Sequence, residues 1–225
     1  MTIRKTGLPD NPRGILILAW PASLLVLALA GGCGPIAGFT TMLFAPDEEV
    51  EAQYQPDPEK LTLVYVDDSG LESRQYVMTQ KLAEHLTAEL KQNKVVQRTV
   101  PYENLIRLQQ RKPNAMSMYT PDQIAQQLGA EQLVLVKIKQ LTVTDPDAPG
   151  MFRGHLSYTV SVRDPQNHSE LWPRDQIDGH PLPDVTLKEE SSEFRHYGQR
   201  VRQKLIERAV PPVAKLFYDH KVPRM

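Results

Sequence analysis

The fold is decided by one continuous apolar stretch, Leu133-Val134-Leu135-Val136-Lys137-Ile138. Its first four residues are apolar and lack the alternation of a half-buried strand. Such a run is typical of a strand that is covered on both faces of its sheet. We therefore expect residues 133–138 to form a central strand.

A strand and a long helix are predicted upstream of this central strand. Residues 61–66, Leu-Thr-Leu-Val-Tyr-Val, are rich in β-forming side chains, and the turn-forming Asp67-Asp68-Ser69-Gly70 follows. Apolar residues at steps of four then predict a helix packed on that strand. These residues are Met78, Leu82, Leu86 and Leu90. Residues 95–100 are expected to form a second strand, so that strand, helix and strand make one crossover unit.

Two short helices are predicted next. Pro101 is expected to begin the first. The second has a clear start signal, because Thr120 can cap it, Pro121 suits the first helical position and Gln123 can complete a capping box. Gly129 is expected to end this helix.

The second half of the chain predicts an antiparallel hairpin and a closing helix. Residues 156–162 alternate apolar and polar side chains, 164–167 form a turn, and 170–172 return as the partner strand. A Pro-rich loop should follow, and then a helix that ends or kinks at two adjacent prolines. The loop prolines are Pro181 and Pro183, the helix stripe is Phe194, Tyr197, Val201 and Leu205, and the terminating prolines are Pro211 and Pro212.

Together these elements predict an α/β (α+β) fold. We expect a mixed sheet of about five strands with packed helices and an antiparallel hairpin at one edge. A globular part of about 160 residues is large enough to bury its own core. Residues 61–225 are therefore predicted to be a single domain.

The amino-terminal segment has the pattern of a secretory signal peptide. Three basic residues precede an apolar segment at 14–30, and small residues then lead to the only cysteine of the chain, Cys33. The stretch Leu29-Ala30-Gly31-Gly32-Cys33 resembles the lipobox of bacterial lipoproteins, although Ala30 stands where that motif prefers leucine.

This resemblance implies that residues 1–32 are removed as a signal peptide and that Cys33 is lipidated. Several acyl chains give durable membrane anchoring, whereas a single chain is marginal. Gly34 follows in place of the aspartate that often retains such proteins at the inner membrane. By resemblance to enterobacterial sorting, this favours the outer membrane, with the protein facing the periplasm.

Two other readings of this segment remain open. The apolar segment could stay uncleaved as a membrane span, although about 20 apolar residues are usually needed and Pro21 interrupts this one. Cys33 could also be an ordinary buried cysteine, although it lies between Gly32 and Gly34, outside any amphipathic pattern.

Residues 33–60 are expected to be the lipidated cysteine and its tether. Four acidic residues between Asp47 and Glu51, followed by Pro56 and Pro58, favour an extended, solvated segment. Such a tether would reach at most roughly 90 Å from the bilayer.

Composition limits the function classes. The chain has 26 basic and 27 acidic residues, and removing residues 1–32 takes three and one of them, which leaves 23 and 26. A nearly neutral chain has no basic field for nucleic acid. With its one cysteine assigned to lipid, the domain has no disulfide and must be stabilised by its core.

No catalytic group, metal site or cofactor is predicted. The six histidines lack zinc-ligand spacing, and neither a nucleophile elbow nor a glycine-rich phosphate loop is present. The adjacent Asp67 and Asp68 could do acid–base work, but their position after a strand favours capping. Trp172 is a possible contact for a partner, and the alternative is that it covers its own core.

The order of elements resembles a group of periplasmic lipoprotein domains that includes LpoB, CsgG and the amino-terminal domain of TolB. The resemblance spans roughly residues 60–175 and is carried by residues 67–70, by 124–130 leading into 133–136, and by 162–164 followed by Leu171-Trp172. It implies noncatalytic binding, assembly or activator work through an envelope protein partner, with oligomers possible. The alternative is a hydrolase or transferase acting on envelope polymers, which would need a cleft of convergent polar residues.

Overall fold

The computed structural model describes residues 47–73, 75–114, 118–143, 151–190 and 197–223. Within this part of the chain, one compact unit runs from Glu48 to Val222 and combines four helices with a mixed sheet, as the α+β prediction requires. In chain order the elements are β1 (Glu48–Val50), β2 (Thr62–Asp67), α3 (Tyr76–Gln92), α4 (Tyr102–Arg111), α6 (Pro121–Gln127), β3 (Gln132–Thr142), β4 (Met151–Asp164), β5 (Ser169–Trp172), β6 (His180–Pro181), β7 (Val185–Glu190), α7 (Tyr197–Lys215) and β8 (His220–Val222).

The main sheet is built around β3, which confirms the central strand predicted at residues 133–138. The strand order is β2-β3-β4-β5, and β6 and β7 also pair with β4. β2 runs parallel to β3, with Thr62 opposite Gln132, whereas β4 is antiparallel to β3, with Val160 opposite Val136. The predicted hairpin is formed by β4 and β5, and β5 lies at the end of this strand order.

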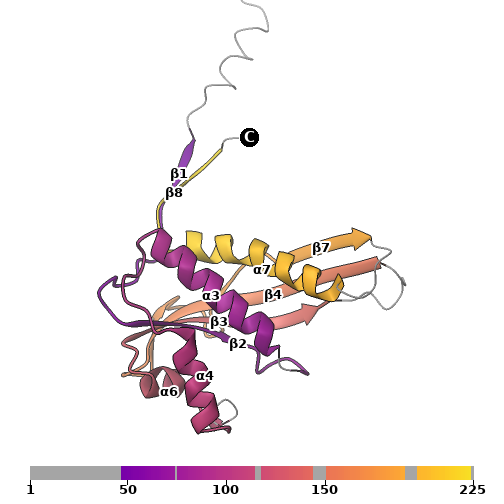
Figure 1. Cartoon of the computed structure of the whole chain (residues 1–225). Coiled ribbons are helices and arrows are strands. Elements are labelled where there is room, and N and C mark those ends of the chain that lie inside the picture. Colours follow the sequence, from indigo (N-terminus) through magenta and orange to yellow (C-terminus); the bar gives the residue numbers. More distant parts are fainter. Residues whose placement is uncertain (1–46, 74, 115–117, 144–150, 191–196, 224–225) are drawn as a thin grey trace, which may run out of the picture. The chain divides into compact units, whose positions relative to one another are not determined.

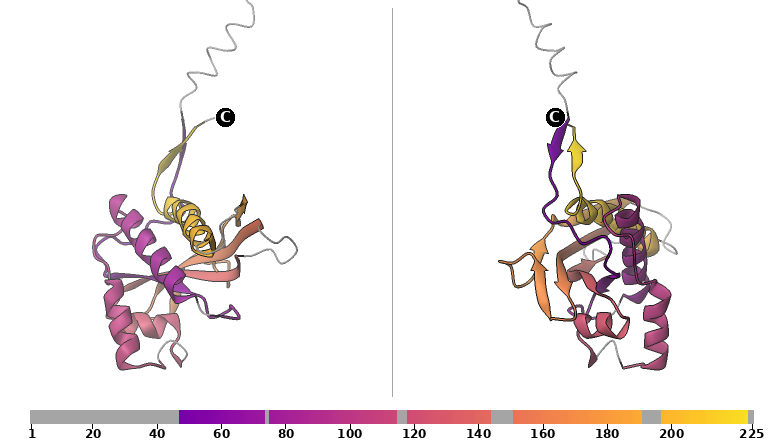
Figure 2. Two further views of the ribbon diagram at one scale, coloured as in Figure 1. Left: turned by 45° about the vertical axis from the view of Figure 1, so that its right-hand side comes forward. Right: turned by 90° about the vertical axis from the view of Figure 1, so that its left-hand side faces the viewer.

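Helices cover both faces of the sheet at β2 and β3 (Figures 1 and 2). α3 and α7 pack on one face, where the core includes Val64 and Val134. α4 and α6 pack on the other face, where the core includes Leu63 and Leu133. Successive residues of one strand therefore face different cores, which explains the unbroken apolar runs of these two strands.

The predicted helix signals are confirmed. The four residues of the predicted α3 stripe are all buried. At α6, the Thr120 hydroxyl accepts a hydrogen bond from the Gln123 backbone N–H at 3.3 Å, and the Gln123 side chain accepts one from the Thr120 N–H at 2.9 Å. Gly129, just beyond α6, has a φ of +71°, a conformation that glycine adopts without steric cost.

The strand predicted at residues 95–100 is wrong. Only Thr99 forms a bridge, parallel to Thr62, and two further hydrogen bonds join the Thr62 backbone to Arg98 and Val100. The segment passes along the edge of β2 and places Val95 in the core beside α3. Its valines are therefore buried although the segment does not form a continuous run of β-sheet hydrogen bonds.

The sheet also has more strands than predicted, six instead of about five. The extra strands β6 and β7 lie in the region expected to be only a Pro-rich loop, and both pair with β4. β4 spans 14 residues, so one edge of it offers room for three short partners. In β7 the buried Val185 and Leu187 alternate with the exposed Thr186 and Lys188, a pattern too short to stand out in the sequence.

The two prolines predicted to end or kink the closing helix do not end it. α7 continues through Pro211 and Pro212 to Lys215. Val213 and Ala214 are fully buried in the core, and this packing holds the last turn in helical form although the prolines lack N–H donors. Phe194, from the predicted helix stripe, lies outside the described residues.

The compact unit begins earlier than the predicted boundary at residue 61. Residues 48–60, expected to belong to the tether, include β1, which pairs antiparallel with β8 and places Glu49 opposite Lys221. The backbone N–H groups of Gln53 and Tyr54 both donate to the Leu216 carbonyl. These contacts attach the segment to the end of α7, which the local sequence pattern did not reveal.

Candidate functional site

The predicted lipidation site, Cys33, and the residues Leu29, Ala30, Gly31 and Gly32 before it lie outside the described residues. In the part of the chain that the structure does describe, no helix is both long and apolar enough to cross a membrane.

Trp172, the predicted partner contact, lies half-buried at the end of β5. Its ring stacks on Tyr54 with centroids 6.2 Å apart and meets Phe217 edge-on at 5.9 Å. The His180 ring is 5.0 Å away, and burial lowers the pKa of this histidine. Trp172 thus packs against the core and, with Arg174 among others, also lines a shallow depression of about 380 Å³.

The two carboxylates considered for catalysis make structural contacts. Asp67 accepts a hydrogen bond from the Ser69 N–H at 2.9 Å, and Asp68 accepts one from the Gln75 N–H at 2.5 Å. Gln75 is the N-cap residue of α3, so Asp68 occupies the start of that helix. This hydrogen bond favours the capping interpretation for Asp68, although the side chain of the N-cap residue itself makes no capping hydrogen bond.

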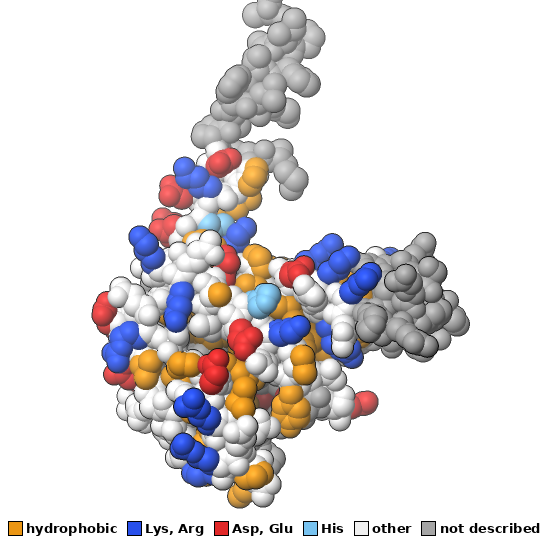
Figure 3. Space-filling model, in the orientation of Figure 1, with side chains coloured by type: hydrophobic (Ala, Val, Ile, Leu, Met, Phe, Trp, Pro, Cys, Tyr) orange, Lys and Arg blue, Asp and Glu red, His pale blue; other side chains and the backbone are white. Residues whose placement is uncertain are grey.

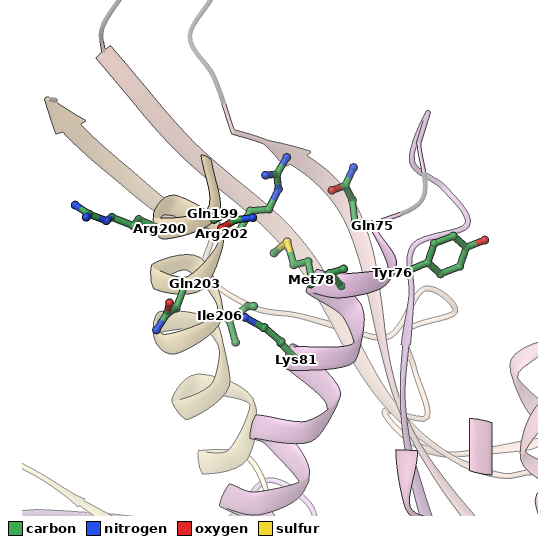
Figure 4. A pocket seen from close by; sticks show the side chains of 10 residues that line it. Gln75, Tyr76, Met78, Lys81, Gln199, Arg200, Arg202, Gln203 and Ile206 are labelled. Carbon is green, nitrogen blue, oxygen red and sulfur yellow. The ribbon is translucent and has the colours of Figure 1, made fainter. Parts of the chain in front are cut away.

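A groove follows directly from this turn, between the first turns of α3 and α7 (Figure 4). It encloses about 660 Å³ and is lined from both helices. We call it the α3–α7 groove and define it by its lining residues: Gln75, Tyr76, Val77, Met78, Lys81, Gln199, Arg200, Arg202, Gln203 and Ile206. The groove lies at the amino-terminal end of α3, which is the helix that follows β2 in the chain. Ligands of α/β proteins often bind near the carboxyl ends of strands.

The bottom of the groove is apolar and buried, and its exposed rim has both polar and apolar side chains. Met78 and Ile206 point into the space between the two helices and are each 2% exposed. At the rim, by contrast, Tyr76 is 52% and Val77 is 71% exposed. Large apolar side chains this exposed next to a concave surface are a feature of binding sites.

The charges of the groove are of one sign. Lys81 and Arg200 are exposed, Arg202 is half-buried, and none of the described lining residues is acidic. The Nε atom of Arg202 is buried and has no hydrogen-bond partner among the described residues. The positive charge continues along α7, which has five basic residues and one acidic residue, Glu207. Lys and Arg side chains gather over the start of this helix in Figure 3.

A second polar cluster, which the sequence did not reveal, joins α6 to the β4–β5 hairpin. The Oδ2 atom of Asp122, a residue 5% exposed, is 2.9 Å from Nη2 of Arg163 and 3.9 Å from Nδ1 of His168. Gln126 adds a hydrogen bond to the Pro165 carbonyl at 2.6 Å. In the sequence, Asp122 looked like an ordinary acidic residue in the first turn of a helix. Its ion-pair partner Arg163 lies far away in the sequence. Because the cluster connects two elements, we assign it a structural role.

No group of three or more His, Cys, Asp or Glu side chains that could hold a metal ion occurs in the residues that the structure describes. None of the lining residues described for the α3–α7 groove is of these four types. Its described lining consists of cationic, amide, apolar and tyrosine side chains.

Comparison with known proteins gives distant likenesses. No family model and no curated protein matches the chain. Among solved structures, the lipoprotein GNA1162 from Neisseria meningitidis has a TM-score of 0.41 at 13% identity, covering 69% of this chain and 99% of that one. A PelC dodecamer from Paraburkholderia phytofirmans has a TM-score of 0.35 at 9% identity, with coverages of 74% and 96%.

The LpoB C-terminal domain from Salmonella enterica is also similar, with a TM-score of 0.29, 12% identity and coverages of 70% and 94%. Similar solved structures thus include bacterial lipoproteins and one member of the group that the sequence resembles. These likenesses are distant, and the proposals below rest on the residues of this chain.

Proposed function

We propose that this protein is an exported lipoprotein whose domain binds other proteins of the bacterial cell envelope without catalysing a reaction. The observation that carries the proposal is the stretch Leu29-Ala30-Gly31-Gly32-Cys33 behind an apolar segment with a basic start. Lipidated Cys33 anchors the domain at the periplasmic face of a membrane, and Gly34 favours the outer membrane.

The position of β1 limits the distance between the domain and the membrane that holds Cys33. The compact unit begins at Glu48, fifteen residues after Cys33. At about 3.3 Å per residue, this segment spans at most roughly 50 Å, instead of the 90 Å expected for a tether that ends at residue 60. The domain is therefore held close to its membrane, where its partners are other envelope proteins.

The polar residues of the domain support a binding role. Asp67 and Asp68 accept backbone hydrogen bonds in the turn before α3, and Asp122 is paired with Arg163. The α3–α7 groove, in contrast, is lined by cationic, amide and apolar side chains, and its described lining holds no carboxylate that could act as a general acid or base. This combination suits recognition of a partner.

Cys33→Ala tests the anchor. We expect the wild type to remain with membranes through carbonate washing, because multiple acyl chains hold it, and the variant to move to the soluble fraction. Gly34→Ala, which keeps the cysteine and a small residue beside it, serves as the control and should remain bound. A Cys33→Ala variant that stays in the membrane would show that the apolar segment 14–30 is an uncleaved anchor instead.

A further inference from the structure

We propose that the α3–α7 groove binds an acidic, partly apolar segment of an envelope protein. This inference rests on the proposed binding function and names the surface that performs it and the chemistry of its partner. Three features of the groove support it: its positive charge, its apolar and amide side chains, and its concave form.

The first feature is positive charge that no acidic side chain balances among the described lining residues. Lys81 from α3 and Arg200 and Arg202 from α7 line it, and within the described residues none of them forms a salt bridge with an acidic side chain. The unpartnered Nε of Arg202 is a buried donor, which is costly unless an acceptor arrives. Because the whole chain has a net charge of −1, this basic surface is local, and carboxylates of a partner complement it.

The source of this charge is the side chains and not a free helix end. Asp68 already accepts the N–H of Gln75 at the start of α3. A carboxylate therefore already lies at that helix terminus, and substitution of the basic side chains tests their contribution directly.

The second feature is the pairing of apolar atoms with amides. Met78 and Ile206 close the bottom of the groove as part of the core, and the apolar side chain that a ligand can reach at the rim is Val77. Gln75 and Gln199 offer donors and acceptors that match a peptide backbone. A simple inorganic anion would contact only the cationic side chains, whereas a polypeptide segment can contact the cationic, amide and apolar side chains together.

The third feature distinguishes a polypeptide from a membrane. The bottom of the groove, at Met78 and Ile206, lies between two helices below the exposed rim, so a flat bilayer surface would contact the rim alone. A chain segment can enter the groove, place apolar side chains against Val77 and present carboxylates to the basic side chains of the rim. The geometry therefore favours an acidic protein segment over the headgroups of anionic lipids.

Photo-crosslinking in cells tests this assignment on the full-length, membrane-anchored protein. The crosslinking amino acid p-benzoylphenylalanine replaces Val77, at the rim, and in a control it replaces Arg107, which is exposed on α4 outside the groove. We expect an adduct at position 77 only, and mass spectrometry of that adduct should identify a peptide in which acidic residues outnumber basic ones. An adduct with phospholipid or glycan, with a neutral or basic peptide, or at no higher level than at position 107 would overturn the proposal.

Charge reversal tests the same surface quantitatively. A synthetic copy of the crosslinked segment is the probe, and its dissociation constant is measured with the purified full-length protein. Lys81→Glu with Arg200→Glu should weaken binding by roughly twenty-five-fold, since each exposed ion pair contributes up to about fivefold. Arg107→Glu, a matched reversal on an exposed helix face, should leave binding unchanged. Equal effects of the two reversals would contradict the assignment.

Membrane fractionation of the same variants separates this inference from the proposed anchoring. If the groove variants lose the crosslink and remain in the membrane, both statements stand. If they keep the crosslink while Cys33→Ala still leaves the membrane, the groove assignment fails and the lipoprotein proposal survives.

Discussion

Gly154→Ala is expected to lower the free energy of unfolding by about 2 kcal/mol, because it inserts a methyl group into a filled contact. Gly154 lies in β4, where α7 crosses the sheet. A Cβ at this position would be 2.6 Å from Cγ1 of Val201 and 3.1 Å from Cδ1 of Leu205. Both neighbours are fully buried, so they cannot move aside without shifting the helix. Urea denaturation of the purified protein measures the effect.

The matched control for this substitution is Gly70→Ala. The nearest atom to a Cβ at residue 70 is the Ile138 carbonyl oxygen at 3.8 Å, an ordinary contact, so we expect a change below about 0.5 kcal/mol. A double-mutant cycle identifies the cause, since Val201→Ala should be less destabilising beside Ala at position 154 than in the wild type. Equal costs of Val201→Ala in the two backgrounds would show that overpacking against this valine is not the reason.

The fold should lose stability in alkali through Tyr158. The ring of Tyr158 is 1% exposed, and its hydroxyl donates to the Ala209 carbonyl of α7 at 3.2 Å. Burial raises the pKa of Tyr158 from 10.0 to about 12. The folded state therefore keeps this proton more tightly than the unfolded state, so the stabilisation is complete below pH 10 and is lost as the pH rises to about 12. The expected loss over this window is roughly 2–3 kcal/mol.

Tyr158→Phe isolates this contribution. The variant should be less stable at pH 7 by about 1 kcal/mol, because the Ala209 carbonyl loses its donor, and its stability should fall less steeply above pH 10. Tyr54, Tyr102 and Tyr218 also have pKa values raised by burial, so part of the alkaline slope should persist. Tyr76→Phe, at a tyrosine that is 52% exposed, is the control and should keep the wild-type profile. A Tyr158→Phe variant with an unchanged slope would contradict this assignment.

The sequence predicted those elements whose structure is determined by residues close together in the chain. The run at 133–138, the stripe of α3 and the capping box at Thr120 each depend on residues within a few positions, and each is confirmed. β7 was not predicted because it pairs with β4, a strand more than twenty residues away, and has little pattern of its own. Likewise, only packing of the following residues shows why α7 continues through Pro211 and Pro212.

The candidate site was less predictable than the fold. Lys81 and Arg200 are more than a hundred positions apart in the sequence, and nothing in either local segment marks them as neighbours. The excess of basic residues in α7 was a readable signal, but the near-neutral charge of the whole chain concealed it. Trp172 was identified from residue type alone, and its role as a partner contact stays a prediction.

The intact mass of the mature protein, extracted from cell membranes in detergent, tests the central claim most directly. We expect a chain that lacks residues 1–32, begins at Cys33 and carries the additional mass of acyl chains, because the stretch before Cys33 is proposed to be cleaved and lipidated. A mass that corresponds to the unmodified chain with residues 1–32 still present would contradict the lipoprotein proposal and assign the membrane contact to the apolar segment itself.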